Sequence, residues 1–157
     1  MNPSDVFCME EAFRQAKKSF DEGGLPIGSV LAEGARILGR GHNRRVQQGD
    51  PILHGEMDCL RDAGRRESYR ETTLYTTLSP CMMCAGTIVQ FKIPRVVVGE
   101  NRSFGGNEQF LRDHGVEVTL LDDARCRELM RSYIEAHPSI WREDIAEDEA
   151  RGGAGAQ

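Results

Sequence analysis

The sequence predicts a single α/β domain, built as a three-layer α/β/α sandwich around a mixed sheet of about five strands. Its 157 residues and 17.5 kDa suffice for one buried core but not for two ordinary domains. Short strand-like segments alternate with helix-periodic ones, and the first two strand-like segments are joined by a turn. We expect the domain to span residues 1–146, followed by a disordered tail over 147–157, which is charged and then rich in Gly and Ala.

The first elements are a helix and a hairpin. Apolar residues recur at intervals of three and four over residues 5–22, with Ser4 as the expected N-cap and Gly23 and Gly24 as the stop. Two short segments then follow, residues 27–32 and 36–41, separated by Glu33-Gly34-Ala35. That turn composition predicts two antiparallel strands.

The rest of the chain alternates helix and strand. We expect helices over residues 54–63, 81–91, 107–114 and 124–136, and strands over 72–77, 95–99 and 117–121. Ser79 and Pro80 supply a helix start, with Ser79 as N-cap and Pro80 in the first turn. Gly64, Gly115 and Pro138 mark helix ends.

Charge and composition narrow the classes of function. The chain carries 20 basic and 25 acidic residues, a formal charge of -5, and no basic run is longer than two residues. This argues against a nucleic-acid partner. No apolar stretch is long enough to cross a bilayer, so we expect no membrane partner. Five cysteines, an odd number, and the lack of an N-terminal apolar leader pattern favour a reducing, cytoplasmic location.

A split metal signature is the most informative feature. His54-Gly55-Glu56 is followed by Pro80-Cys81-Met82-Met83-Cys84. Cysteines at i and i+3 project from the same side of a helix, and a helix N-terminus favours thiolate. His54, Cys81 and Cys84 therefore make a three-ligand site for one Zn²⁺ per subunit, with the fourth position open for water.

Glu56 is the expected proton shuttle. Two residues along a regular helix would place it almost opposite His54, so we infer that His54 lies in an irregular first turn. Glu56 could then take a proton from a zinc-bound water and deliver it to a substrate ring nitrogen. The pattern H-x-E followed by P-C-x-x-C is that of zinc-dependent nucleobase deaminases.

Other interpretations of the metal signature remain. A C-x-x-C pair can be a redox pair or half of a structural zinc site. A structural site needs a fourth ligand, for which the pool is Cys8, Cys59, Cys126, His42, His114 and His137. The three cysteines lie in helical patterns and are expected in the core. The three histidines are expected as capping or surface residues. Met82 and Met83 are expected in helix packing, although Met82 could face the site.

Four segments carry a more specific resemblance. The chain resembles fungal-type cytosine deaminases at residues 53–56, 72–81, 97–101 and 141–145, and the similarity runs from about residue 10 to 145. The resemblance implies a cytidine deaminase-like fold, a homodimer, and hydrolysis of the free base cytosine to uracil and ammonia in pyrimidine salvage. Zinc-bound hydroxide would attack C4, with Glu56 as the shuttle.

The resemblance also implies the substrate contacts. Asn43 and the backbone N–H of Gly55 would hold the carbonyl and N1 edge of the base. The backbone carbonyl of Ser79 and the carboxylate of Asp144 would receive the amino group. The remaining walls of the pocket would come from Phe104, Trp141, Ile27 and Leu78.

Two departures from the fungal type lie near the expected lid. Arg142 stands where an aromatic residue is expected, and the loop after Phe104 is shorter and contains Gly105-Gly106. They leave open a deaminase of another small base, such as guanine, isocytosine or a substituted cytosine. More distant alternatives are a tRNA-editing deaminase and an inert zinc-stabilised interaction domain, which the acidic balance and Glu56 respectively argue against.

Overall fold

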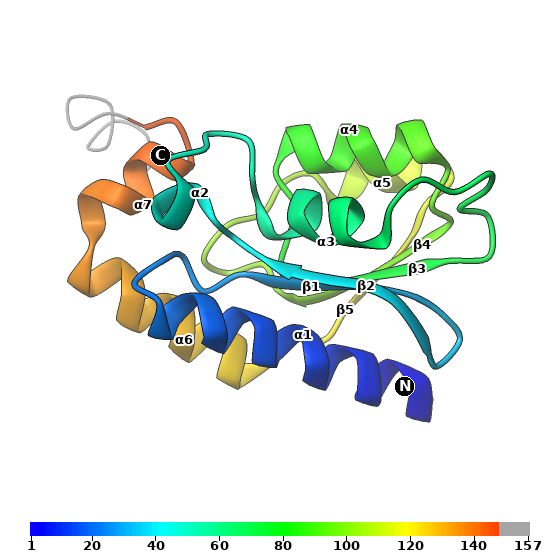
Figure 1. The fold of residues 1–157 in the computed structure, drawn as a ribbon, viewed down its shortest axis with the longest axis horizontal. Helices are drawn as coiled ribbons and strands as arrows, with labels where there is room; N and C mark the ends of the chain where they lie inside the picture. The colour runs from blue at the N-terminus through cyan, green and yellow to red at the C-terminus, as the bar shows by residue number, and fades with distance from the viewer. Residues whose placement is uncertain (148–157) are drawn as a thin grey trace.

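The computed structural model describes residues 1–147 of the chain, and its elements follow the predicted alternation (Figure 1). The helices are α1 (Pro3–Asp21), α2 (Arg45–Gln48), α3 (Gly55–Ala63), α4 (Met82–Phe91), α5 (Glu108–Asp113), α6 (Ala124–Ala136) and α7 (Pro138–Asp144). The strands are β1 (Gly28–Glu33), β2 (Arg36–His42), β3 (Thr73–Leu78), β4 (Arg95–Glu100) and β5 (Glu117–Leu120). The predicted tail, apart from Glu147, lies outside the described residues.

The strands form one mixed five-stranded sheet, as predicted, in the order β2-β1-β3-β4-β5. β1 pairs antiparallel with β2, because the hairpin reverses the chain, and β1 also pairs antiparallel with β3 on its other side. β3, β4 and β5 run parallel, each joined to the next by a helix. The carboxyl ends of β3 and β4 therefore meet at one edge of the sheet, where α4 and the loop after Glu100 begin.

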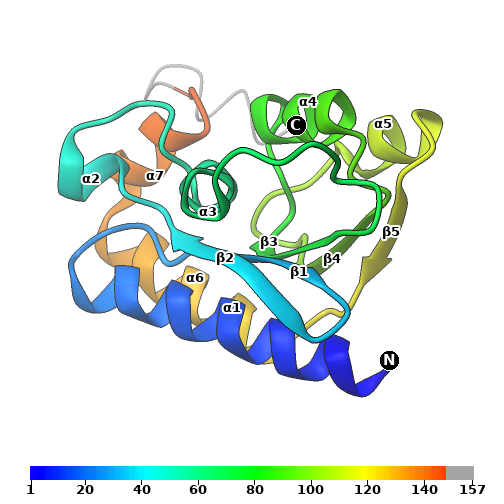
Figure 2. The same cartoon turned by 45° about the vertical axis from the view of Figure 1, so that its right-hand side comes forward.

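Helices cover both faces of the sheet, which confirms the sandwich. α1 and α6 lie on one face, and α3, α4 and α5 lie on the other (Figures 1 and 2). The core has one buried cluster under α3, α4 and α5, which includes Leu31, Leu74 and Ile88, and a second under α1, which includes Met9 and Val30. A third cluster surrounds Trp141 and docks α7 at the end of the sheet that carries the site.

Two expected helix caps are wrong. Asn2, not Ser4, caps α1, and its Oδ1 accepts a hydrogen bond from Asp5 N at 2.8 Å. Pro3 then occupies the first turn, where its missing N–H costs nothing. Cys81, not Ser79, is the N-cap of α4, because the chain stays extended through Pro80 and leaves Cys81 at the helix start.

Two short helices at the site were not anticipated as separate elements. α2 has four residues and follows β2 directly. α7 begins at Pro138, so the proline that ends α6 also starts the next helix.

Three cysteines and three histidines lie outside the metal signature, and all but His42 have the burial that the sequence predicted. Cys8, Cys59 and Cys126 are buried, at 0%, 0% and 3% exposure, as expected for core residues. His114 and His137 cap helix ends and are exposed. His42 was expected as a capping or surface residue and is instead fully buried. Its Nδ1 contacts the Asn43 carbonyl at 3.0 Å, and its Nε2 lies 3.4 Å from Glu22.

In the described part of the chain, no helix combines the length and apolar character that a membrane span requires.

Candidate active site

The metal signature converges at the N-termini of two helices. His54 is the N-cap of α3, with an extended backbone at φ -68° and ψ 165°, and Cys81 is the N-cap of α4. His54 Nδ1 lies 3.5 Å from Cys81 Sγ and 3.8 Å from Cys84 Sγ. These three residues are the one group of three or more His, Cys, Asp or Glu side chains with metal-ligand spacing among the described residues.

The three atoms fit a tetrahedral zinc ion. Zn–S and Zn–N bonds of about 2.3 and 2.1 Å at a tetrahedral angle place neighbouring ligand atoms roughly 3.6 Å apart. The two measured separations, 3.5 and 3.8 Å, match that value. The donor set of one imidazole and two thiols also suits zinc.

The electrostatics of the cluster favour a cation. Hydrogen bonding with the Cys84 thiol lowers the pKa of Cys81 to about 4, and His54 acts in the same direction. The same hydrogen bond raises the pKa of Cys84, because the Cys84 thiol donates its proton to Cys81. Burial would lower the pKa of His54, but Cys81, Glu56 and Asp144 together raise it. A bound dication would take the place of the shared proton and would be held by both sulfurs.

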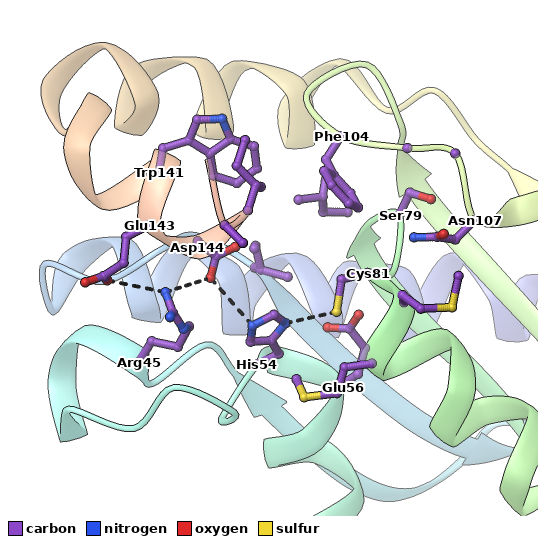
Figure 3. Close-up of a pocket in the computed structure, with 18 of the residues that line it drawn as sticks. Arg45, His54, Glu56, Ser79, Cys81, Phe104, Asn107, Trp141, Glu143 and Asp144 are labelled. Carbon is purple, nitrogen blue, oxygen red and sulfur yellow. Dashed lines mark hydrogen bonds and ion pairs between the residues drawn. The ribbon is translucent and has the colours of Figure 1, made fainter. Parts of the chain in front are cut away.

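Glu56 lies beside this cluster, as the inferred irregular turn requires. Because His54 precedes the first helical residue, its side chain is not bound to the helical spacing that would have placed Glu56 opposite it. Figure 3 shows the Glu56 carboxylate next to His54 and Cys81. It is 3% exposed, and burial raises its pKa to about 7. A carboxyl group with that pKa can both accept and donate a proton near neutrality.

A cavity of about 620 Å³ opens above the cluster. Its walls include most of the residues that the sequence singled out: Ile27, His54, Glu56, Leu78, Ser79, Cys81, Phe104, Trp141 and Asp144. Phe104 comes from the loop after β4, and Trp141 and Asp144 come from α7 (Figure 3). The fold thus brings five separate segments of the chain to one cavity.

Asn43, Gly55 and Cys84 are not among the residues lining that cavity. Asn43 lies behind it, fully buried, and its Oδ1 accepts a hydrogen bond from Arg45 N at 3.0 Å. Its Nδ2 has no hydrogen-bond partner within the described residues. A buried amide N–H₂ without a partner is costly, and a ligand carbonyl would satisfy it.

Asp144 is held close to the cluster. It is buried, and its Oδ1 lies 3.7 Å from His54 Nε2 and 3.4 Å from Arg45 Nη1. Burial raises the pKa of Asp144, while His54 and Arg45 oppose that shift. The carboxylate therefore faces the ring nitrogen of His54 that points away from the two sulfurs (Figure 3).

Several cavity residues escaped the sequence analysis. Met83, expected in helix packing, is 37% exposed and lines the cavity instead, and Met82, which is 53% exposed, lines the cavity as the sequence allowed. Arg45, Glu143 and Asn107 line it too. Asn107 donates from Nδ2 to the Pro80 carbonyl at 3.0 Å, which ties the Phe104 loop to the start of α4. No local pattern marks these residues, because their partners are far away in the sequence.

The loop that carries Phe104 is fixed by two carboxylates. Glu100 Oε2 accepts from the backbone N–H groups of Arg102 and Ser103, at 2.7 and 2.9 Å. Glu108 accepts from Asn101 Nδ2 at 2.7 Å and from Gly106 N at 2.9 Å. The loop is thus anchored at both ends despite its two glycines.

Residues 3–100 of the chain match the family described as the cytidine and deoxycytidylate deaminase zinc-binding region. The chain belongs to this deaminase family. The match contains the whole metal signature, and the His-Cys-Cys cluster suits the one zinc ion that the family name implies.

Individual relatives agree with the family assignment. The deaminase is 49% identical to cytosine deaminase of Candida albicans, over 94% of this chain and all of that one. It is 37% identical to tRNA-specific adenosine deaminase of Streptococcus pyogenes, over 82% of this chain and 88% of the relative.

Solved structures share the fold. A chain from a study of A-to-I editing by tRNA:A34 deaminases superimposes with a TM-score of 0.72 at 29% identity, over 79% of this deaminase and 99% of that chain. Guanine deaminase from Nitrosomonas europaea gives a TM-score of 0.69 at 20% identity, with 84% of each chain covered. These solved structures therefore confirm the fold of the deaminase.

Proposed function

We propose that this deaminase hydrolyses the free base cytosine to uracil and ammonia. The observation that carries the proposal is the 49% identity to a cytosine deaminase over 94% of the chain, joined to a cavity that is lined by His54 and Cys81. The identity extends well beyond the 3–100 match that defines the wider family. Pyrimidine salvage in the cytoplasm is the role that follows from this reaction.

His54, Cys81 and Cys84 are the proposed zinc ligands. Bound zinc would supply a Lewis acid that lowers the pKa of a water molecule. The position of Cys81 and Cys84 at the start of α4 lets the helix stabilise the thiolates. Asp144, 3.7 Å from His54 Nε2, would hold the imidazole with Nδ1 toward the metal.

Glu56 is the proposed proton shuttle. It would take a proton from the attacking water and place it on the ring nitrogen next to C4. The water oxygen would bond to C4, and Glu56 would pass the second proton to the amino group, which leaves as ammonia. Burial suits this cycle because it brings the pKa of the carboxyl group to about 7.

Asn43 would recognise the other edge of the base. Its free Nδ2 would donate to the ring carbonyl, and Oδ1 would accept from N1–H alongside the bond from Arg45 N. The Gly55 N–H would share the ring carbonyl. A nucleoside lacks N1–H because the sugar is attached there, so the pocket would reject cytidine.

The amino group and the faces of the base would meet the opposite walls. The Ser79 carbonyl and the Asp144 carboxylate would accept from the amino group. Phe104 and Trp141 would enclose the ring, with Ile27 and Leu78 completing the apolar lining.

Ammonia release tests the proposal. Zinc-analysed protein is assayed on cytosine, cytidine, guanine, adenine and an adenosine-containing RNA stem-loop, beside Glu56→Gln. We expect release from cytosine alone, lowered by roughly 10²- to 10⁴-fold in the variant with zinc retained. Release from guanine or RNA and not from cytosine would contradict the substrate, and an active Glu56→Gln would contradict the shuttle.

We also propose that the deaminase forms a homodimer through the face around α4. Several large apolar side chains are exposed there or nearby, at 60% for Ile52, 53% for Met82 and 39% for Phe91. Exposed apolar groups of this size favour a protein interface. Sedimentation velocity at micromolar concentration should give twice the 17.5 kDa chain mass, and a single species at 17.5 kDa would contradict the dimer.

A reducing compartment is consistent with the cysteines. All five are free, and Cys81 and Cys84 must stay reduced to serve as ligands.

A further inference from the structure

Arg45, the first residue of α2, projects into the cavity from the side opposite the Phe104 loop (Figure 3). Its side chain is 12% exposed. Among the described residues that line the cavity, it is the one Lys or Arg. The cavity also holds Glu56, Asp144 and Cys81, which are acidic groups. A cation buried among them is not explained by the proton shuttle or by the metal ligands.

The guanidinium group of Arg45 is oriented from its own loop. Nε donates to the Pro51 carbonyl at 3.1 Å, which fixes the plane of the group. Nη1 then reaches Asp144 Oδ1 and Glu143 Oε2, each at 3.4 Å. One side chain thus joins the segment after β2 to α7, which lies 98 and 99 residues further along the chain.

The two carboxylates differ in what the contact is worth. The Glu143 side chain is 70% exposed, so its ion pair with Arg45 is solvated and contributes little. The Asp144 side chain is 7% exposed, and its pairing with Arg45 replaces lost hydration. The Asp144 oxygen that meets Arg45 is also the one that lies 3.7 Å from His54 Nε2. Arg45 therefore helps to determine where that oxygen sits.

We propose that Arg45 is a positioning residue that anchors α7 over the cavity and holds the Asp144 carboxylate in place for the substrate amino group. The second half rests on the proposed function, whereas the anchoring of α7 does not. Lysine cannot fully replace Arg45 in this role. A single ammonium on a shorter stem cannot contact the Pro51 carbonyl and both carboxylates with the fixed fork of a guanidinium group.

Trp141 gives a readout that needs no substrate. It is the single tryptophan of the chain, lies on α7 and is 8% exposed, so its fluorescence reports how α7 sits. We expect Arg45→Gln to raise the acrylamide quenching constant of Trp141 at least about twofold, because α7 loses an anchor and opens more often. The quenching constant of Arg45→Lys should lie between those of the wild type and Arg45→Gln.

Arg142→Gln is the matched control. It removes the same charge from α7 itself, and among the described residues the Arg142 side chain bonds only Ser139 Oγ, at 3.5 Å. Its quenching constant should match the wild-type value. Substitution of the Arg45 side chain leaves the bond from Arg45 N to Asn43 intact, so the variant does not disturb that residue directly.

Kinetics test the link to Asp144. Arg45→Gln should lower kcat/KM for cytosine roughly 10- to 100-fold, mainly through a higher KM, with zinc content unchanged. In the Asp144→Asn background, Arg45→Gln should lower kcat/KM little further, because both variants remove the same interaction. Glu143→Gln should stay within about twofold of wild type.

Three results would overturn the proposal: wild-type quenching in Arg45→Gln, equal quenching changes in Arg45→Gln and Arg142→Gln, or losses of kcat/KM that multiply in the Arg45→Gln/Asp144→Asn double variant. If Arg45→Gln does not reach the folded state, Arg45→Lys carries the same comparison, and wild-type values there contradict the need for a guanidinium group. A protein that does not deaminate cytosine leaves the quenching result decisive for the anchoring of α7.

Discussion

The close approach of α3 to β2 at Gly41 fixes the distance between the sheet and both His54 and Glu56. A Cβ atom built on Gly41 would lie 2.4 Å from Cys59 N and 2.7 Å from Asp58 C, both backbone atoms of α3. Ordinary van der Waals contact begins at 3.4 Å, so Gly41→Ala would require α3 to move by roughly 1 Å. His54, at the N-cap of the helix, would move with it.

Two effects of different size follow from that movement. Overpacking of this kind typically lowers the free energy of unfolding by about 1–3 kcal/mol. A displacement of about 1 Å at reacting groups can lower the rate by about 10²-fold. We therefore expect Gly41→Ala to remain folded at 25 °C but to lose about two orders of magnitude in kcat/KM.

Urea denaturation and steady-state kinetics measure the two effects, with Gly86→Ala as the control. Gly86 lies inside α4, and a Cβ added there meets nothing within 4 Å of the described chain. That variant should be as stable as wild type or more stable, by up to about 1 kcal/mol, because alanine favours the helix. A Gly41→Ala protein with wild-type stability and wild-type kcat/KM would refute the reasoning.

Three further predictions concern acid stability, the metal and the loop. Arg95 pairs with Asp5 through two bonds of 2.8 Å and lowers the pKa of that buried carboxyl group. The stabilisation is therefore present above the unfolded pKa of about 4 and is lost as the pH falls through the lower folded value. Asp5→Asn should be less stable than wild type in urea at pH 7, with a gap that narrows at pH 3, and an equal gap at both pH values would contradict the pairing. A chelator should lower the Tm of the zinc-loaded protein but leave that of Cys81→Ser almost unchanged, and an equal drop in both would rule out Cys81 as a ligand. Glu108→Gln should speed hydrogen exchange of the Gly106 amide by loosening the bond at 2.9 Å, and unchanged exchange would show that the charge is not needed there.

Local patterns in the sequence predicted the side chains that come together in the cluster of His54, Cys81 and Cys84. Two cysteines at i and i+3 share a helix face whatever the surrounding fold, so Cys81 and Cys84 had to approach one another. The place of His54 at an irregular turn followed from the need to bring Glu56 to the same side. The structure agrees, with His54 extended at the N-cap of α3.

Local patterns were less reliable for helix ends and for single polar residues. Asn2 and Cys81, not Ser4 and Ser79, are the N-caps of α1 and α4. Several adjacent residues could each have capped the helix, and the path of the preceding chain selects among them. His42 resembled a surface residue because its burial and its proximity to Glu22 arise only when the end of β2 meets the end of α1.

The sequence by itself determined the alternation of helices and strands, the pairing of Cys81 with Cys84 and the place of His54 relative to Glu56, because each depends on spacing within one element. The tertiary structure alone decided which side chains enclose the cavity. Arg45 meets Asp144 across 99 residues, and Met82 and Met83 are partly exposed and line the cavity. Such contacts depend on how the elements pack, and spacing along the chain carries no information about a partner in another element.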